Sequence, residues 1–270
     1  MKDEIKIVDH KLDFTNYNPK GKKVLLYSNG SDSWLIKHLW KPDILLYVDM
    51  GSRYSENEIE KLKADPENAN VVIDKLDLGK WERPDAIIPL RNLYLVMWAS
   101  NYGDEICLGA TAGDRVLDKS PTFAEKTTDL LTYLYTPQHW VPEGRDIKVN
   151  IDFKKYTKAQ MIKMFVEQGG DIEAAFKKSF SCYDPVDGHE CWHCKPCFRK
   201  YVAFKLAGYK FTKDVEDVVI DYIKKDIYPQ IEANTYGRRD EEIEIINALE
   251  MYDNENNIPH NYNEIKKRYE

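Results

Sequence analysis

The chain has no run of about eighteen apolar residues, the length that a membrane-spanning helix needs. Its N-terminus, MKDEIKIVDHKLDF, is charged throughout and has no apolar signal core. A strong positive charge is also missing, since 39 basic and 46 acidic residues give a formal net charge of −7. This balance argues against direct nucleic-acid binding as the main task. We therefore expect a cytoplasmic protein without a membrane partner.

Cysteine is scarce, with five residues, and four of these lie within sixteen positions as C-x8-C-x2-C-x2-C: Cys182, Cys191, Cys194 and Cys197. In a cytosolic chain this cluster favours zinc over disulfides. Four thiolates suit the tetrahedral geometry of zinc, and short C-x2-C arcs supply adjacent corners. His193 is a weaker candidate ligand, because four cysteines already close the site. A closed site has no open position, so the metal is expected to be structural.

Buried strands and helices alternate over the first 150 residues. Nearly continuous apolar runs predict strands at residues 22–28, 43–51, 70–78 and 104–111. Helices are predicted at residues 32–40, 55–65, 91–103 and 120–135. The expected fold is α/β, with a parallel sheet covered by helices on both faces. Such sheets bind ligands at the carboxyl ends of strands, near the point where strand order reverses.

The alternation stops after Val149, and three regions are expected. Residues 1–150 form a nucleotide-binding α/β domain, and residues 151–210 form a helical zinc-binding region that completes the active site. Residues 211–270 form a helical C-terminal extension, which serves as helical packing or as a subunit contact in a homodimer. The helix at 55–65 is expected to begin with a capping box between Ser55 and Glu58.

Six small or polar residues separate the first strand from the first helix: Ser28, Asn29, Gly30, Ser31, Asp32 and Ser33. Backbone N–H groups at a helix start attract anions, and small side chains let a phosphate approach them. A plain turn with a serine or aspartate cap fits the same pattern without any ligand. The loop is not a Walker loop, because it lacks the glycine-lysine pattern.

The loop resembles the S-G-G-x-D-S loop of the PP-loop pyrophosphatase superfamily, whose members split ATP into an adenylate and pyrophosphate. Asn29 stands at the first glycine of that pattern, and asparagine tolerates left-handed backbone angles. The resemblance implies a fold of the adenine nucleotide alpha hydrolase type, with Asp32 as a candidate for Mg²⁺. It implies that ATP is bound by Leu26, Tyr27, Ser28, Asn29, Gly30, Ser31, Asp32, Ser33 and Arg91.

The loop and the cysteine cluster together resemble the 7-cyano-7-deazaguanine synthase family of the queuosine pathway. The stretches VDMGSRYSENE, PLRNLYLVMWASNYG, CLGATAGDRVLD and SFSCYDPVDGHECWHCKPCFRKYVAF are similar to that family as well. The resemblance implies a ligase that converts 7-carboxy-7-deazaguanine and ammonia into a nitrile. One ATP adenylates the carboxylate, ammonia gives an amide, and a second ATP activates the amide oxygen for elimination.

On this resemblance the candidate catalytic residues are Asp32, Asp114 and Arg53. Arg53 and Arg91 are expected to bind phosphate or the substrate carboxylate, or else to form surface ion pairs. Asp114 is expected to orient the guanine edge or accept a proton, or else to cap a turn, and to matter more than Lys119.

The stretch after Asp114 reads RVLDKSPTF and departs from the family's proline-aspartate-cysteine-arginine segment. Lys119 stands at the cysteine of that segment and Ser120 at its arginine. The departure leaves open another carboxylate substrate or a reaction that stops at the amide. Ser181 and Tyr183, which flank the first zinc cysteine, are weaker site candidates.

Two other classes of function remain open. A tRNA-thiolating PP-loop enzyme would also adenylate its substrate, but it needs a reactive cysteine. Only Cys107 is left over, and it is expected to lie buried in a strand, where a thiol is inert. A non-enzymatic zinc-knuckle binding module is the second alternative, against which the intact serine-aspartate-serine end of the loop argues.

Overall fold

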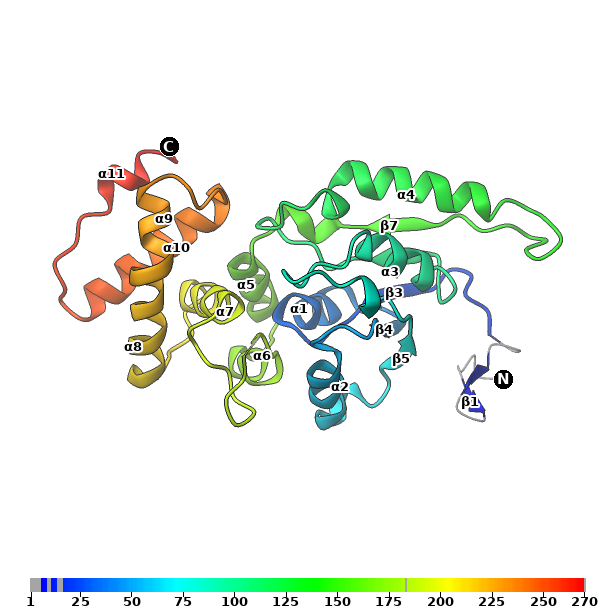
Figure 1. Ribbon diagram of the computed structural model, residues 1–270, viewed down its shortest axis with the longest axis horizontal. Coiled ribbons are helices and arrows are strands. Elements are labelled where there is room, and N and C mark those ends of the chain that lie inside the picture. The colour runs from blue at the N-terminus through cyan, green and yellow to red at the C-terminus, as the bar shows by residue number, and fades with distance from the viewer. Residues whose placement is uncertain (1–5, 9–10, 14–16, 183, 270) are drawn as a thin grey trace.

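A parallel sheet of five strands forms the centre of the molecule (Figure 1), whose computed structural model describes residues 6–8, 11–13, 17–182 and 184–269. The four predicted strands are confirmed as β3 (Lys23–Leu26), β4 (Ile44–Asp49), β5 (Val72–Lys75) and β6 (Glu105–Cys107). A fifth strand, β7 (Lys148–Asn150), was not predicted and pairs with β6. Its three residues are too few to show an apolar run, so only the pairing reveals it.

Helices cover both faces of this sheet, as predicted. Leu25 and Tyr27 pack against α1 (Ser31–Trp40) and α2 (Ser55–Ala64) on one face. Val24, whose side chain points the other way, packs with residues of the helices on the second face, α3 (Arg91–Ala99) and α4 (Pro121–Leu134). Burial on both faces explains the continuous apolar runs of the strands.

The strand order β5-β4-β3-β6-β7 reverses direction at β3. After β3 the chain adds β4 and then β5 on one side of it. The chain then returns and adds β6 and β7 on the other side of β3. The carboxyl ends of β3 and β6 therefore flank a topological switch point, where α/β sheets bind their ligands. The Ser28–Ser33 loop and the segment after Cys107 both begin there.

The remaining helices extend the molecule away from the sheet (Figure 1). α5 (Lys158–Glu167) and α6 (Ile172–Lys178) pack against α1. The chain then continues through α7 (Lys195–Leu206), α8 (Lys213–Tyr222), a π-helical turn (Ile223–Ile227), α9 (Tyr228–Glu232), α10 (Arg239–Glu255) and α11 (Asn263–Lys266). Two short strands, β1 (Lys6–Val8) and β2 (Lys11–Asp13), form an antiparallel pair. In the described residues, no helix is both long and apolar enough to cross a membrane.

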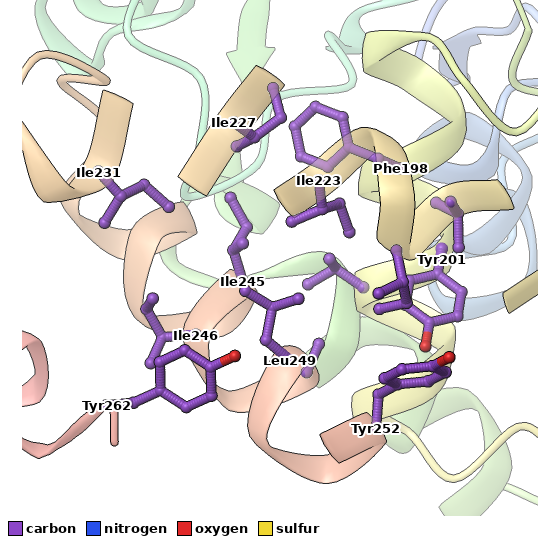
Figure 2. Close-up of a cluster of buried hydrophobic side chains, with 14 of the residues drawn as sticks. Phe198, Tyr201, Ile223, Ile227, Ile231, Ile245, Ile246, Leu249, Tyr252 and Tyr262 are labelled. Carbon is purple, nitrogen blue, oxygen red and sulfur yellow. The ribbon is translucent and has the colours of Figure 1, made fainter. Parts of the chain in front are cut away.

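The helical character predicted beyond Phe211 is confirmed, and these helices share a core with α7. Apolar side chains of α8 to α11 surround Phe198 and Tyr201 of α7 (Figure 2). The cluster includes Ile223, Ile245 and Leu249, all of them buried. Burying each such side chain stabilises the fold by about 1.5–3 kcal/mol. The C-terminal helices are therefore packed onto the zinc-binding region.

The predicted capping box at the start of α2 is wrong. The helix begins at Ser55 itself, with Tyr54 as its N-cap and no side-chain cap bond. The Ser55 hydroxyl accepts the N–H of Ser52 at 3.0 Å, and Glu58 accepts the hydroxyl of Tyr47 at 2.8 Å. Because the helix starts one residue early, Glu58 cannot reach back to the cap and turns toward β4 instead.

Candidate functional site

The loop between β3 and α1 leaves the start of the helix without a side-chain cap. Gly30 is the N-cap residue of α1 and has extended backbone angles (φ −67°, ψ 158°). The hydroxyl of Ser33 accepts the N–H of Ser28 at 3.2 Å and donates to the carbonyl of Gly30 at 3.1 Å. The plain turn with a serine or aspartate cap is therefore not what forms, and the loop has the shape of an anion cradle.

Asn29 has the left-handed conformation that was expected of it, with φ +58°. Its side chain is buried and turns into the protein. The amide nitrogen donates to the carbonyl of Lys178 at 3.1 Å, and the amide oxygen accepts the hydroxyl of Tyr27 at 2.6 Å. Asn29 thus shapes the loop through its side-chain hydrogen bonds, and its part in ATP binding stays a prediction.

A cavity of about 300 Å³ opens at the switch point in front of this loop. Eight of the residues predicted to bind ATP line it: Leu26, Tyr27, Ser28, Gly30, Ser31, Asp32, Ser33 and Arg91. Apolar walls come from β4 and α3 through Leu46, Val48, Met50 and Leu95. A phosphate-sized cradle beside apolar walls suits a nucleotide, whose base is flat and apolar and whose phosphates are charged.

Asp32, at the start of α1, is paired with a lysine that the sequence analysis did not identify. Its Oδ2 atom accepts Lys158 Nζ at 2.8 Å, and both side chains are about one-quarter exposed. The other oxygen, Oδ1, is buried and has no hydrogen-bond partner among the described residues. A buried carboxylate oxygen without a hydrogen-bond partner is uncommon in a folded protein.

Lys119, from the divergent stretch, also lines the cavity. Its Nζ donates to the carbonyl of Gly109 at 3.0 Å and to Asp114 Oδ2 at 3.1 Å. Asp114 also accepts the N–H of Thr111 at 3.0 Å, so it organises the turn after β6. Burial opposes ionisation of Asp114, but the charge of Lys119 and these hydrogen bonds outweigh it and lower its pKa. Asp114 itself is not among the residues that line the cavity, so Lys119 is the better placed of the two.

Arg53 is not among the residues that line the cavity, and its role in binding phosphate or the substrate carboxylate stays a prediction. Its Nε donates to Glu82 Oε1 at 2.7 Å, and its Nη2 donates to the carbonyl of Arg83 at 2.8 Å. Glu82 also accepts the backbone N–H of Arg53 at 2.9 Å. Through these contacts the guanidinium group links two loops. This arrangement matches the surface ion pair that was the alternative to phosphate or carboxylate binding.

Glu58 and Tyr47 line the cavity as well, and no local sequence pattern marks either of them as a site residue. Burial raises the pKa of Glu58, against the opposing effects of the Tyr47 hydrogen bond and the nearby Arg91. The pair thus places a carboxyl group that protonates easily next to a hydroxyl donor. Such a pair suits proton transfer at a reacting group.

The sulfur atoms of Cys182, Cys191, Cys194 and Cys197 converge, with all four within 4.8 Å of one another. Zinc–sulfur bonds of about 2.3 Å place tetrahedral sulfurs about 3.8 Å apart. The 4.0 Å between the sulfurs of Cys191 and Cys197 matches that spacing closely. His193 instead makes a 2.7 Å contact with the carbonyl of Cys191. The four-cysteine cluster is confirmed, and its donors fit a closed, structural zinc.

The cysteine cluster is joined to the loop in front of α1 by the segment 178–181. Phe180 N donates to the carbonyl of Asn29 at 3.1 Å, and Ser31 N donates to the hydroxyl of Ser181 at 3.4 Å. Ser181 N donates to Glu190 at 2.8 Å. The knuckle therefore holds one wall of the phosphate cradle. Tyr183, the other weak candidate, lies outside the described residues.

Lys200 of α7 fastens the same segment from the inside. Its buried Nζ donates to the carbonyl of Ser179 at 2.5 Å and to Glu190 at 2.9 Å. Burial lowers the pKa of Lys200, although Glu190 opposes this effect. The buried ion pair between Lys200 and Glu190 therefore fixes the position of the cysteine-containing segment relative to α7.

Cys107 lies in β6 and is fully buried, as expected. Burial raises the pKa of its thiol, with the nearby carboxylate of Asp152 adding to the effect. The nucleophilic form of cysteine is the thiolate, so this residue is unreactive.

A phosphate cradle, a cavity at the switch point and a zinc knuckle define a nucleotide-binding α/β protein of the PP-loop type. The family model "Queuosine biosynthesis protein QueC" matches residues 57–208, which is more than half of the 270-residue chain. The chain belongs to this family.

Curated relatives support the same assignment. The 7-cyano-7-deazaguanine synthase of Leptospira interrogans is 26% identical over 143 residues, which is 50% of this chain and 56% of the relative. The Methanobrevibacter smithii protein of the same name is 26% identical over 163 residues, 60% of this chain and 66% of the relative. The Clostridium kluyveri one is 28% identical over 137 residues, 47% of this chain and 56% of the relative. The chain thus spans about half to two thirds of these relatives.

Proposed function

We propose that this chain is an ATP-dependent 7-cyano-7-deazaguanine synthase. It would convert 7-carboxy-7-deazaguanine and ammonia into the nitrile through two adenylated intermediates. The observation that carries the proposal is the cavity at the switch point. One side is built from the uncapped start of α1, and cationic groups of Arg91, Lys119 and Lys158 line it. ATP and a carboxylate substrate are both anionic, so both fit this set of charges.

The chemistry needs three things from the protein. The loop at residues 28–33 would hold the phosphates, and Asp32 would carry Mg²⁺ once Lys158 turns toward a phosphate. Lys119 would bind the carboxylate and then stabilise the developing negative charge on its oxygen. The Glu58 carboxylate would accept protons that ammonia loses in forming the amide and the nitrile, and the Tyr47 hydroxyl would orient that carboxylate.

The divergent loop supports a second outcome of the same chemistry. Lys119 brings a fixed positive charge to the position where the family resemblance expects a cysteine. A cation beside the amide oxygen can withdraw charge from it and slow its attack on a second ATP. The enzyme would then release the amide or accept another aromatic carboxylate.

The two alternative classes receive less support. Sulfur transfer to tRNA needs a reactive thiol, but Cys107 is buried and four cysteines converge on the metal cluster. A zinc-knuckle module without activity has no need for a cavity lined by a phosphate loop and three cations. In such a module, Tyr27 and the serines of the loop would only pack within the fold.

Product analysis by mass spectrometry tests the proposal. Purified protein is incubated with 7-carboxy-7-deazaguanine, ATP, Mg²⁺ and ammonia, and both the base and the nucleotide products are identified. Nitrile together with AMP and pyrophosphate is the expected result. Amide alone supports the shortened reaction. Turnover to ADP and phosphate, or turnover only with a different acid, contradicts the adenylating mechanism or the substrate assignment respectively.

A further inference from the structure

The C-terminal helices lie outside the stretch that matches the family model, yet one of them touches the loop after β6. The match ends at residue 208, and α10 begins at Arg239. Arg238, which precedes α10, donates from Nη1 to the carbonyl of Gly113 at 3.2 Å. The same nitrogen donates to Glu241 Oε1 at 2.8 Å. A residue 125 positions away along the chain therefore holds the loop that carries Asp114.

Gly113 and the side chain of Glu241 lie so close together that any larger residue at position 113 would displace the Glu241 carboxylate. A Cβ atom added to Gly113 would lie 2.6 Å from Glu241 Oε1 and 3.0 Å from its Cγ. The second carboxylate oxygen of Glu241 accepts Arg199 Nε at 3.0 Å and the hydroxyl of Tyr236 at 2.7 Å. One carboxylate thus joins α7, α10 and the loop after β6.

The helix that makes these contacts is itself rigidly packed. Ile245 and Ile246, one turn beyond Glu241, are buried in the cluster around Phe198 of α7 (Figure 2). A displacement of α10 would open this core, so Arg238 and Glu241 are held in place by packing.

The same loop leads directly to the cavity. Lys154 also holds this loop, because it donates to the carbonyls of Thr111 and Asp114. Asp114 in turn accepts Lys119, whose ammonium group lines the cavity. A continuous set of contacts therefore runs from α10 through Gly113 and Asp114 to Lys119.

We propose that the C-terminal helical region is a positioning element for the carboxylate substrate. Arg238 and Glu241 hold Gly113 so that Lys119 faces the cavity, which sets affinity for the acid but not for ATP. The ATP loop is reached by different contacts, from the segment 178–181. The identity of the acid rests on the proposed function, and Arg238 and Glu241 are positioning residues that do not touch it.

Steady-state kinetics of Arg238→Ala test this inference, with 7-carboxy-7-deazaguanine, ATP and ammonia. Loss of a charged hydrogen bond should raise KM for the acid about tenfold. KM for ATP should stay within about twofold, because the loop in front of α1 keeps its partners. Arg238→Lys retains a donor for the Gly113 carbonyl and should restore part of the affinity. Arg239→Ala is the matched control, since Arg239 bonds to the carbonyl of Arg268 instead.

A readout independent of turnover keeps this test separate from the proposed function. Hydrogen–deuterium exchange of residues 108–119 should be faster in Arg238→Ala and Gly113→Ala, and unchanged in Arg239→Ala. If the wild-type protein does not use the acid, the proposed function is wrong, and the exchange comparison alone decides the positioning claim. Equal exchange at residues 108–119 in all variants would overturn it. So would a rise in both KM values together with a lower melting temperature.

Discussion

Two loops meet at the cavity, and they are held in different ways. The loop at residues 28–33 is shaped by its own hydroxyls and by backbone and amide contacts with residues 178–181. The loop at residues 109–119 is held by cations from elsewhere, with Lys154 lying 40 and Arg238 lying 125 positions from the carbonyls they bind. Both loops therefore depend on segments that are distant in sequence, but neutral backbone, amide and hydroxyl groups hold the first loop, whereas charged side chains hold the second. Nucleotide binding and acid binding should therefore respond to different changes.

The largest expected effect comes from removing the metal behind the first loop. Cys194→Ala should lose bound zinc, destabilise the protein by several kcal/mol and abolish turnover, because structural zinc contributes about 10–16 kcal/mol in zinc-finger peptides. Metal analysis, thermal unfolding and hydrogen–deuterium exchange of residues 28–33 measure these effects.

Cys107→Ala is the control for that change. It removes a buried thiol that is not part of the metal cluster, so the zinc content should stay the same and turnover should persist. A fully folded, active Cys194→Ala protein without metal would contradict the account of the knuckle. Loss of turnover in Cys107→Ala with an intact fold would instead favour a sulfur-transfer enzyme.

Replacing the carboxylate in the first loop should have the next largest effect. Asp32→Ala removes the proposed Mg²⁺ ligand and should lower kcat by about 10²–10³-fold, the usual size of a lost charge-stabilising group. The melting temperature should barely change, because Asp32 is partly exposed and loses only its pair with Lys158. Asp221→Ala, which breaks a surface pair with Lys225, is the control and should leave kcat unchanged.

The second loop should respond to charge and salt. Lys119→Met keeps the length of the side chain but removes the ammonium group, so KM for the acid should rise about tenfold while KM for ATP changes little. Raising the salt concentration should weaken acid binding in the wild type more than in Lys119→Met. Salt screens the charge of the Lys119 ammonium group, and the variant lacks that group. If Lys119→Met raised the KM values for the acid and for ATP equally, the claim that the two loops bind different substrates would be wrong.

A smaller effect is expected at Asn29, whose side chain lies behind the first loop. Asn29→Gly tolerates φ +58° but leaves the carbonyl of Lys178 unsatisfied, which should cost about 1–3 kcal/mol of stability. KM for ATP should rise only a few-fold, as titrations with ATP can show. A loss of ATP binding as large as that of Asp32→Ala would mean that Asn29 contacts the nucleotide directly.

The smallest expected change in stability concerns Glu58, which belongs to neither loop. Its pKa is raised in the folded state, so the folded protein binds this proton more tightly than the unfolded chain does. Stability from this group is present at low pH and is lost as pH rises from about 4.5 through the folded pKa. Glu58→Gln should therefore melt at a slightly higher temperature than the wild type at pH 7, and the difference should shrink on acidification. A variant that is less stable at pH 7 would contradict burial as the cause.

Much of the fold was predictable from the sequence, because the signals were local. Four strands, the helices between them, the left-handed Asn29 and the four-cysteine cluster all follow from apolar runs, turn residues and spacing. β7 was missed because three residues such as Lys148 to Asn150 show no pattern until they pair with β6.

The site was predictable only in part, for a related reason. The residues of the first loop are adjacent in sequence, so their resemblance to a known loop placed them together. Lys158 reaches Asp32 from 126 positions away, and the partner of Arg53 is Glu82 in another loop. No local pattern records which of several lysines or arginines lines the cavity, because tertiary contacts determine this.

The central claim is that a carboxylate oxygen of the substrate is transferred to AMP. An assay with 7-carboxy-7-deazaguanine labelled with ¹⁸O in both carboxylate oxygens measures this directly, by mass spectrometry of the AMP formed. Each adenylation leaves the substrate oxygen on the phosphate when the C–O bond breaks. The account predicts two labelled AMP molecules for each nitrile, or one for each amide if the reaction stops there. Unlabelled AMP, or label recovered only in water or inorganic phosphate, would contradict it.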